Sequence, residues 1–482
     1  MIREPLIFEL SDDGKKSYAL PELDVPVNQE VLKNLNERKD IEGFPQVSEI
    51  EVVRHFTRLS QINYCIDTGF YPLGSCTMKY NPKINEKIAA MPGFQEGHPY
   101  SPASLVQGNL AVIKSLEELL MEITGMDAFS LQPSAGAQGE LLGMMLIRAC
   151  LEERGDPRKY VLIPDSAHGT NPSSAHICGY QVKEIKTTEE GIVDVEDLKR
   201  LMNQEIAAIM ITNPNTLGIF ERDIKKIAHI VHSEGGFVYM DGANMNALLG
   251  YSRPGDMDVD VIHLNLHKTF STPHGGGGPG SGPVGVKQEL KPFLPVPVVE
   301  KDKDGYYFNY DRPKSIGRVK GFYGNYLVMV KALAYILSLG ARGLKEVAEI
   351  AVLNSNYIRK SLEGTYHLKY QAPTLHECVF SDKNQLPTGI KNIDIAKRLI
   401  DYGLHPPTMS FPLIVPGALM IEPTETESKR DLDHFIDAMI KISEEAEKDP
   451  EILKSAPTSA YVSRLDETAA ARNTILRWEP DK

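Results

Sequence analysis

A short apolar run that ends in a lysine, with a glycine-rich loop behind it, constrains this chain more than any other feature. The run covers residues 261–266, His267 and Lys268 follow it, and five of the six residues 275–280 are glycine. A lysine at the exit of a buried strand loses solvation, so its amine gives up a proton more readily. Lys268 is therefore a candidate for an amine that attacks an aldehyde, although most strand-end lysines simply reach water.

A carboxylate follows the preceding apolar run of the chain. Residues 235–240 read as a strand that delivers Asp241 at its C-terminal end. The spacing to Lys268 allows one crossover of an open parallel sheet, in which ligands bind where strands end. A carboxylate at that place could hold the pyridinium nitrogen of pyridoxal phosphate, which needs such a partner to act as an electron sink.

Apolar runs and helical patterns alternate between residues 128 and 287, which predicts a parallel sheet with helices on both faces. The apolar runs cover residues 128–131, 160–164, 206–212, 235–241, 261–266 and 282–287. Polar side chains follow these strands, and five of them fall at one edge of the predicted sheet: His168, Asn213, Thr216, Asp241 and Lys268. A single histidine after a strand is usually structural, but five polar residues at one edge favour a binding site.

Small residues separate the first predicted strand from a helix predicted at 140–153. The turn at 132–139 contains Ser134, Ala135 and Gly136. Small residues let the backbone close on an anion, and the free N–H groups of a helix start attract negative charge. The turn lacks the Lys-Ser/Thr ending of a Walker A loop, and it suits a phosphate cradle and a plain strand-to-helix turn equally well.

Two longer motifs resemble a known family. Residues 263–270 with 273–280 resemble the lysine segment of glycine decarboxylase, the P-protein of the glycine cleavage system, and residues 71–82 resemble a second segment of that family. The similarity extends from about residue 60 to 430. Some members carry two homologous halves in one polypeptide and others split them into two subunits. This chain resembles the cofactor-bearing subunit 2 of the split form, and its length fits one half only.

The resemblance implies a fold, a reaction and a set of site residues. The fold would be fold type I of the pyridoxal-phosphate enzymes, like aspartate aminotransferase, with a mostly parallel seven-stranded sheet and a smaller C-terminal α+β domain. Lys268 would form the Schiff base with pyridoxal 5'-phosphate, Asp241 would contact the ring nitrogen and His168 would stack on the ring. Ser134, Ala135 and Gly136 would hold the phosphate, and Asn213 and Thr216 would lie near the phenolic oxygen or the phosphate. Ala243 and His267 would be further cofactor contacts.

The reaction implied by the resemblance is decarboxylation of glycine, with transfer of the aminomethyl group to the lipoyl group of H-protein in a complex with a homologous subunit 1. His168, His267 and His274 are available as acids or bases by residue type. We expect no bidentate arginine on the substrate, because decarboxylation gains when the carboxylate is poorly stabilised relative to the transition state. The glycines at 275–278 could let the backbone approach the cofactor, act as a hinge for the lipoyl group, or form a plain turn.

Two alternative functions remain at this point. Another fold-type-I enzyme, such as an amino-acid decarboxylase or a sulfur-transferring lyase, would share Lys268, Asp241 and His168 and would need no H-protein. A non-catalytic partner subunit would have no reason to keep Lys268.

Composition limits the partners and the compartment. The net charge of −13 without a basic stripe argues against nucleic acid as the main partner. The N-terminus lacks the features of a signal peptide, and we expect no apolar run of membrane-spanning length. The five cysteines are odd in number, form no CxxC pair and suit a reducing compartment, so we predict a cytoplasmic protein without a metal site.

Three regions are predicted along the chain: an N-terminal arm and loop segment at 1–90, a large cofactor-binding domain at 91–335, and a small α+β domain with a surface tail at 336–482. Periodicity predicts helices at 28–38, 48–59, 105–124, 325–339, 344–362, 393–402 and 429–447. It predicts strands of the small domain at 367–370, 377–380 and 418–422, and irregular chain at 290–299.

Overall fold

The protein is described by a computed structural model, which covers residues 4–477 apart from 20, 27, 29, 31, 32, 34, 35, 37–40, 42 and 276–279. The helix predicted at 28–38 and the glycines at 276–278 fall largely or wholly outside the described residues. The chain forms two compact units, one of residues 1–68 with 455–482 and one of residues 69–454. The predicted boundaries at 90/91 and 335/336 both lie inside the second unit and stay predictions.

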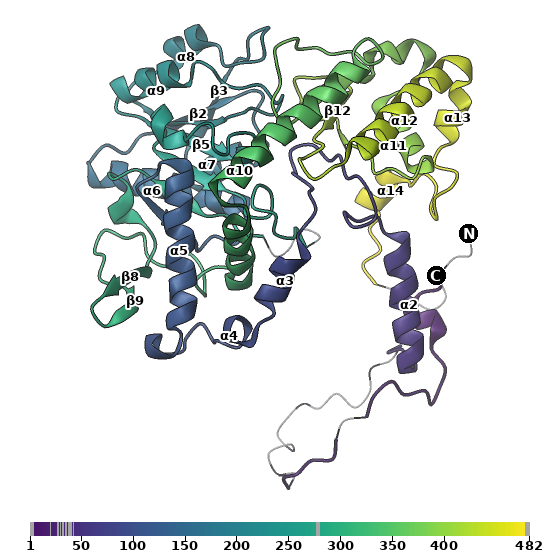
Figure 1. The fold of residues 1–482 in the computed structure, drawn as a ribbon, viewed down its shortest axis with the longest axis horizontal. Coiled ribbons are helices and arrows are strands. Elements are labelled where there is room, and N and C mark those ends of the chain that lie inside the picture. The colour runs from purple at the N-terminus through teal and green to yellow at the C-terminus, as the bar shows by residue number, and fades with distance from the viewer. Residues whose placement is uncertain are drawn as a thin grey trace. The chain divides into compact units, whose positions relative to one another are not determined.

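A seven-stranded sheet is the centre of the second unit, as the family resemblance implies, and it includes β3, which the apolar runs did not predict (Figure 1). Its strand order is β1-β7-β6-β5-β4-β2-β3. The pairs among β6, β5, β4, β2 and β3 are parallel, and β7 pairs antiparallel with both β6 and β1. The bounds are β1 Ala128–Ser130, β2 Tyr160–Pro164, β3 Gln181–Ile185, β4 Ile206–Thr212, β5 Phe237–Gly242, β6 Val261–Leu264 and β7 Val284–Val286.

Helices cover both faces of this sheet. One core cluster joins the inward side chains of α5 and α9 and the first half of α10 to the sheet, and a second cluster joins those of α6 and α7 to its other face. The prediction of fully buried parallel strands is confirmed, since every residue of β4, β5 and β6 is buried. The helices around the large sheet are α5 Gln107–Thr124, α6 Gly136–Glu153, α7 Thr170–Ile177, α8 Val195–Leu201, α9 Ile224–Ser233 and α10 Tyr326–Leu362.

The long helix α10 contains the break that the sequence predicts. Gly340 has a φ of 60° and a ψ of −175°, which interrupt the helical geometry between the two predicted helices, although α10 joins them into one element. The joined helix is long and apolar enough, by length and composition alone, to cross a membrane, so the expectation of no such run was wrong. Half of its most apolar window is buried inside the protein, as in the core helix of a globular fold.

A smaller sheet lies in the C-terminal part of the same unit. It has the order β10-β12-β11, with β10 at Cys378–Ser381, β11 at Thr408–Met409 and β12 at Ala418–Ile421. Its core includes side chains from α11 Asn392–Asp401, α12 Lys429–Lys448 and the second half of α10. Figure 1 shows α10 extending from the seven-stranded sheet to α11 and α12.

Two predictions of local structure in this unit were wrong. Residues 367–370 form no strand. Within this stretch His367 alone pairs, through an isolated bridge to Ser381. The stretch predicted as irregular at 290–299 enters a hairpin of β8 Val298–Asp302 and β9 Gly305–Asn309. The two prolines at 295 and 297 hid the strand start in the sequence, since proline weakens a strand pattern.

The shorter helices complete the second unit: α3 Lys83–Ala89, α4 Pro92–Gln95 and α13 Pro450–Ser455, which ends at the unit boundary. The first unit contains α2 Glu49–Ile62 and α14 Glu467–Arg472. Helix α2 confirms the helix predicted at 48–59, and it begins with Ser48 as N-cap and Glu51 closing the capping box.

Candidate active site

A cavity of about 230 Å³ lies at the carboxyl ends of the central strands. Parallel strands end at a common edge, and there they present the side chains that follow each strand to one site. The cavity is lined by Ser75, Gly136, Ala137, Glu140, His168, Thr170, Thr212, Thr216, Asp241, Ala243, Asn244, His263, Asn265, His267 and Lys268.

The cavity brings together most of the residues singled out in the sequence. Those on its lining are Gly136, His168, Thr216, Asp241, Ala243, His267 and Lys268. Ser134 and Ala135 directly precede the first residue of α6, where the Ser134 N–H and hydroxyl both donate to Gln138 Oε1. Asn213 is fully buried beside Thr212, and its amide oxygen accepts from the Glu221 N–H at 2.9 Å.

The start of α6 is closely fitted to this cavity. A Cβ atom on Gly136 would lie 2.5 Å from Asn265 Nδ2, so a larger residue there would displace the Asn265 side chain. The helix has no side-chain cap at its N-terminus. Free N–H groups and the positive end of the helix dipole therefore point at the cavity, as an anion such as a phosphate requires.

Asp241 belongs to a buried polar network. Its carboxylate accepts from the Ala243 N–H at 2.9 Å and lies 3.3 Å from His263 Nε2. The other ring nitrogen of His263 is 2.6 Å from the Tyr239 hydroxyl, which keeps its proton because burial raises the pKa of Tyr239 well above its ordinary value. Tyr239 thus donates to Nδ1, which leaves Nε2 to donate to Asp241 and fixes the carboxylate as an acceptor.

Glu140 is a second carboxyl group beside Asp241. It accepts from the Thr170 hydroxyl at 2.8 Å, and Asn171 bridges it to Asp241 when its amide is oriented to donate to both. Burial, and after it the Asp241 charge, raise the pKa of Glu140 from 4.5 to about 7. Glu140 therefore holds a proton under conditions in which most carboxyl groups are ionised.

The raised pKa of Glu140 predicts a loss of stability as the pH rises. Between pH 4.5 and about 7 the folded protein keeps this proton while the unfolded chain releases it, so the free energy of unfolding falls through that window. We expect the apoprotein with Glu140→Gln to lose less stability than the wild type over this range. Thermal unfolding midpoints of both proteins at several pH values measure the difference, and parallel curves would contradict the prediction.

Lys268 lines the cavity, and its charge acts on three histidines: His168, His267 and His274. Its Nζ donates to the Ser75 carbonyl at 2.8 Å. Burial lowers the pKa of His267 to about 3 and that of His274 to about 4, with contributions from the Lys268 charge. Partial burial also lowers the pKa of His168, and the Lys268 charge contributes, although the His168 residue is still exposed to solvent. All three are uncharged at neutral pH and can accept a proton.

Several cavity residues were not identified from the sequence. His263 interrupts an apolar strand, and this exception to the pattern was a sequence signal that could have singled it out. The burial of Glu140 at the start of α6 is visible only in the structure. Ser75 lies in the segment that resembles the family, but nothing in its spacing relates it to Lys268. Thr170 and Asn265 carry no local signal that separates them from ordinary loop residues.

The donor set of the cavity fits pyridoxal phosphate. Thr212 Oγ1 and Asn265 Oδ1 are buried and have no hydrogen-bond partner within the described part of the chain, so the cavity offers polar atoms for a ligand. An amine, a carboxylate and a helix N-terminus face the same space, and they match the aldehyde, ring nitrogen and phosphate of that cofactor.

Comparison with known proteins identifies the family. Residues 347–458 match the model of the glycine dehydrogenase C-terminal domain, and residues 141–294 match aminotransferase class V. A probable glycine dehydrogenase (decarboxylating) subunit 2 of Caldanaerobacter subterraneus subsp. tengcongensis is 58% identical over 478 residues, 98% of each chain. The chain belongs to this family. The proteins of the same name from Listeria welshimeri and Bacillus licheniformis are each 55% identical, over 99% of this chain and 98% and 99% of their own lengths.

Solved structures confirm the fold of this glycine dehydrogenase subunit 2 family member. The crystal structure of an inhibitor-bound glycine decarboxylase (P-protein) superposes with a TM-score of 0.71 at 20% identity, covering 85% of this chain and 92% of that chain. A cysteine desulfurase from Escherichia coli superposes with a TM-score of 0.60 at 15% identity, over 81% and 98% of the two chains. Both likenesses concern the fold, which is fold type I as predicted, with a mostly parallel seven-stranded sheet.

Proposed function

We propose that this chain is the catalytic, cofactor-bearing subunit of a two-subunit glycine decarboxylase. It binds pyridoxal 5'-phosphate through Lys268, decarboxylates glycine, and transfers the aminomethyl group to the lipoyl group of H-protein. The observation that carries the proposal is that Lys268, Asp241 and the start of α6 line one cavity in a member of the glycine dehydrogenase subunit 2 family. A homologous subunit 1 is the partner implied by that family name.

The residues of the cavity have separate roles in this proposal. Lys268 would bond to the aldehyde carbon of the cofactor, Asp241 would accept from its ring nitrogen, and His168 would contact its ring. Ser134, Ala135 and Gly136 at the start of α6 would hold the phosphate. Thr216, Ala243 and His267 line the remaining cavity, and Asn213 fixes the chain after β4 through its bond to the Glu221 main chain.

The surroundings of the cofactor suit decarboxylation. The bound cofactor supplies an electron sink for the electron pair that remains when the glycine carboxylate leaves as carbon dioxide. Asp241 would favour a protonated ring nitrogen, since His263 and the Ala243 N–H hold its carboxylate in place. None of the described residues that line the cavity is an arginine, which supports the expectation that the substrate carboxylate is not strongly stabilised.

Protons can be moved by the uncharged histidines next to Lys268. His267 is fixed by the Ser281 N–H, which donates to its Nδ1 at 3.3 Å, and its ring packs edge-on against His274 at a centroid distance of 5.1 Å. His274 Nε2 is buried and has no partner among the described residues. His274 therefore offers a nitrogen that no described residue occupies, and we assign it as a candidate for proton exchange beside Lys268.

We place the enzyme in the cytoplasm. All five cysteines are free thiols, as a reducing compartment maintains. The apolar window of α10 is half buried within the fold, which supports its role as a core helix rather than a membrane span.

Exchange of labelled bicarbonate into the carboxyl group of glycine tests this function. We expect exchange only when the chain, loaded with pyridoxal phosphate, is mixed with both its homologous subunit and lipoylated H-protein. H-protein without its lipoyl group is the matched control and should give background exchange. A loaded chain that decarboxylates a free amino acid without H-protein, or that gives no exchange in any mixture, would instead favour another pyridoxal-phosphate reaction.

A further inference from the structure

The segment of residues 74–81, which we call the strap, forms one wall of the active-site cavity. Its Ser75 carbonyl accepts the hydrogen bond from Lys268 Nζ at 2.8 Å, and Ser75 lines the cavity. None of the roles assigned above uses this contact. The strap is part of the motif at 71–82 whose purpose the sequence leaves open.

The backbone of the strap is held in an unfavourable conformation. Ser75 has a φ of 64° and Thr77 a φ of 48°, both in the left-handed region that side chains other than glycine rarely adopt. Such a conformation persists only where the surrounding contacts over-determine it, and it often marks a functional segment. At Gly74 a Cβ atom would lie 2.1 Å from the Met420 side chain, so the strap packs directly on β12.

Two buried carboxyl groups of the small sheet hold this conformation. Glu377 Oε2 accepts from the Ser75 N–H at 2.9 Å. Glu422 accepts from the Thr77 N–H at 2.8 Å and from the Thr77 hydroxyl at 2.6 Å. Both carboxyl groups are fully buried, and burial with their mutual repulsion raises the pKa of Glu377 well above its ordinary value. The pKa of Glu422 is raised by burial as well, and the Lys268 charge opposes both shifts.

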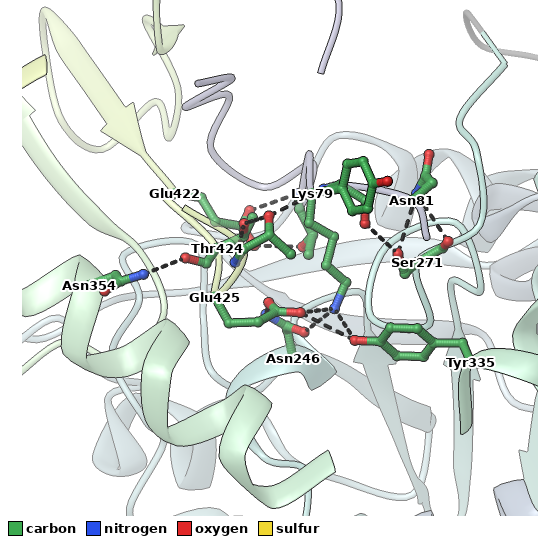
Figure 2. A network of polar contacts seen from close by, with 12 residues as sticks. Lys79, Asn81, Asn246, Ser271, Tyr335, Asn354, Glu422, Thr424 and Glu425 are labelled. Atoms are coloured by element: carbon green, nitrogen blue, oxygen red, sulfur yellow. Dashed lines mark hydrogen bonds and ion pairs between the residues drawn. The ribbon is translucent and has the colours of Figure 1, made fainter. Parts of the chain in front are cut away.

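The other end of the strap is fixed by Lys79. Figure 2 shows its side chain reaching between Glu425, Asn246 and Tyr335, at 2.8, 2.9 and 3.1 Å from Nζ. Asn81 then donates to the Ser271 carbonyl at 3.0 Å, in the turn directly after Lys268. The Ser75 carbonyl is therefore held from both sides at a set position relative to the catalytic lysine.

We propose that the strap is the docking point for the amino group of Lys268 after glycine has displaced it from the cofactor, with Glu377 and Glu422 as positioning residues. In this exchange the bond from the cofactor carbon to Nζ breaks and a bond to the glycine nitrogen forms. Two protons of the glycine ammonium pass to Nζ, which leaves as an ammonium group. The Ser75 carbonyl accepts from that ammonium group and so favours the displaced state.

This inference rests on the proposed function, because it requires a cofactor bound at Lys268. The proposed role of the strap goes beyond lining the cavity, because its Ser75 carbonyl would bind the displaced Lys268 amino group. The carbonyl must stay where the free ammonium group can reach it, and the left-handed turn puts it there only while Glu377 and Glu422 bind the adjacent N–H groups.

Glycine titrations of the loaded enzyme, assembled with its partner subunit and followed by cofactor absorbance, test the inference. Loss of the two hydrogen bonds that hold Thr77 predicts that Glu422→Ala raises the half-saturating glycine concentration about tenfold. Glu422→Gln should stay within about twofold, because an amide can accept from the Thr77 N–H and donate to its hydroxyl. Thr77→Ala, a milder change, should give a rise of about threefold and carries the test if Glu422→Ala fails to fold.

A matched control and a second measurement separate this role from general destabilisation. Glu117→Ala removes another buried carboxyl group with a raised pKa, on α5, and should leave the glycine titration unchanged. Amide hydrogen exchange at Ser75 and Thr77 should accelerate in the Glu422→Ala apoprotein. Faster exchange with an unchanged glycine titration, or an equal shift in Glu117→Ala, would overturn the inference. A wild-type enzyme whose absorbance does not respond to glycine would overturn the proposed function instead.

Discussion

Replacing Lys268 by alanine is expected to remove the visible absorbance band of the bound cofactor while the protein stays folded. The band depends on the covalent bond between the cofactor and the lysine amine, and no other lysine lines the described cavity. Activity in the bicarbonate exchange should fall by about three orders of magnitude or more, as for other enzymes that lose a nucleophile. Absorbance spectra after addition of pyridoxal phosphate, together with circular dichroism, measure both effects.

Lys287→Ala is the matched control for this experiment. Lys287 follows β7 and donates to the Gly125 carbonyl at 2.9 Å, away from the cavity lining. Its loss should leave the band and the exchange close to those of the wild type. A band that survives in Lys268→Ala, at the same wavelength and intensity, would show that the central assignment is wrong.

Replacing Lys79 by methionine is expected to lower the stability of the protein by about 3–5 kcal/mol, because it leaves a buried carboxylate without its cation. The Lys79 side chain is 1% exposed and that of its partner Glu425 is 7% exposed. Methionine fills a similar volume, so the loss reports the ion pair rather than a cavity. Urea unfolding of the apoproteins, followed by circular dichroism, measures the change.

The double variant Lys79→Met with Glu425→Gln is the informative comparison. It removes the unpaired charge, and we expect it to recover part of the lost stability, since replacing both members of a buried pair is far less costly than removing one. A Lys79→Met variant as stable as the wild type would contradict the prediction, because the ion pair would then contribute nothing to stability.

The central part of the active site could be predicted because it depends on local patterns. Lys268 and Asp241 each follow an uninterrupted apolar strand, and the ends of parallel strands meet at one edge whatever the details of packing. Gly136 could be found for a similar reason, since a helix start after a strand is a local feature. The same local reasoning failed in two places. Prolines hid the start of β8 at Val298, and residues 367–370 have a strand-like sequence but form only a single bridge.

Sequence by itself therefore determined six of the seven strands of the large sheet, its polar edge and the place of Lys268 at that edge, while β3 was missed. Tertiary structure decided which distant segments complete the site. Ser75 reaches Lys268 across 193 residues, and Glu422 reaches Thr77 across 345. Such contacts depend on how the small sheet packs on the large one, which no periodicity of the chain records. The network around Asp241 was hidden for the same reason, because Glu140 and His263 acquire their roles only when a helix and a strand are packed together.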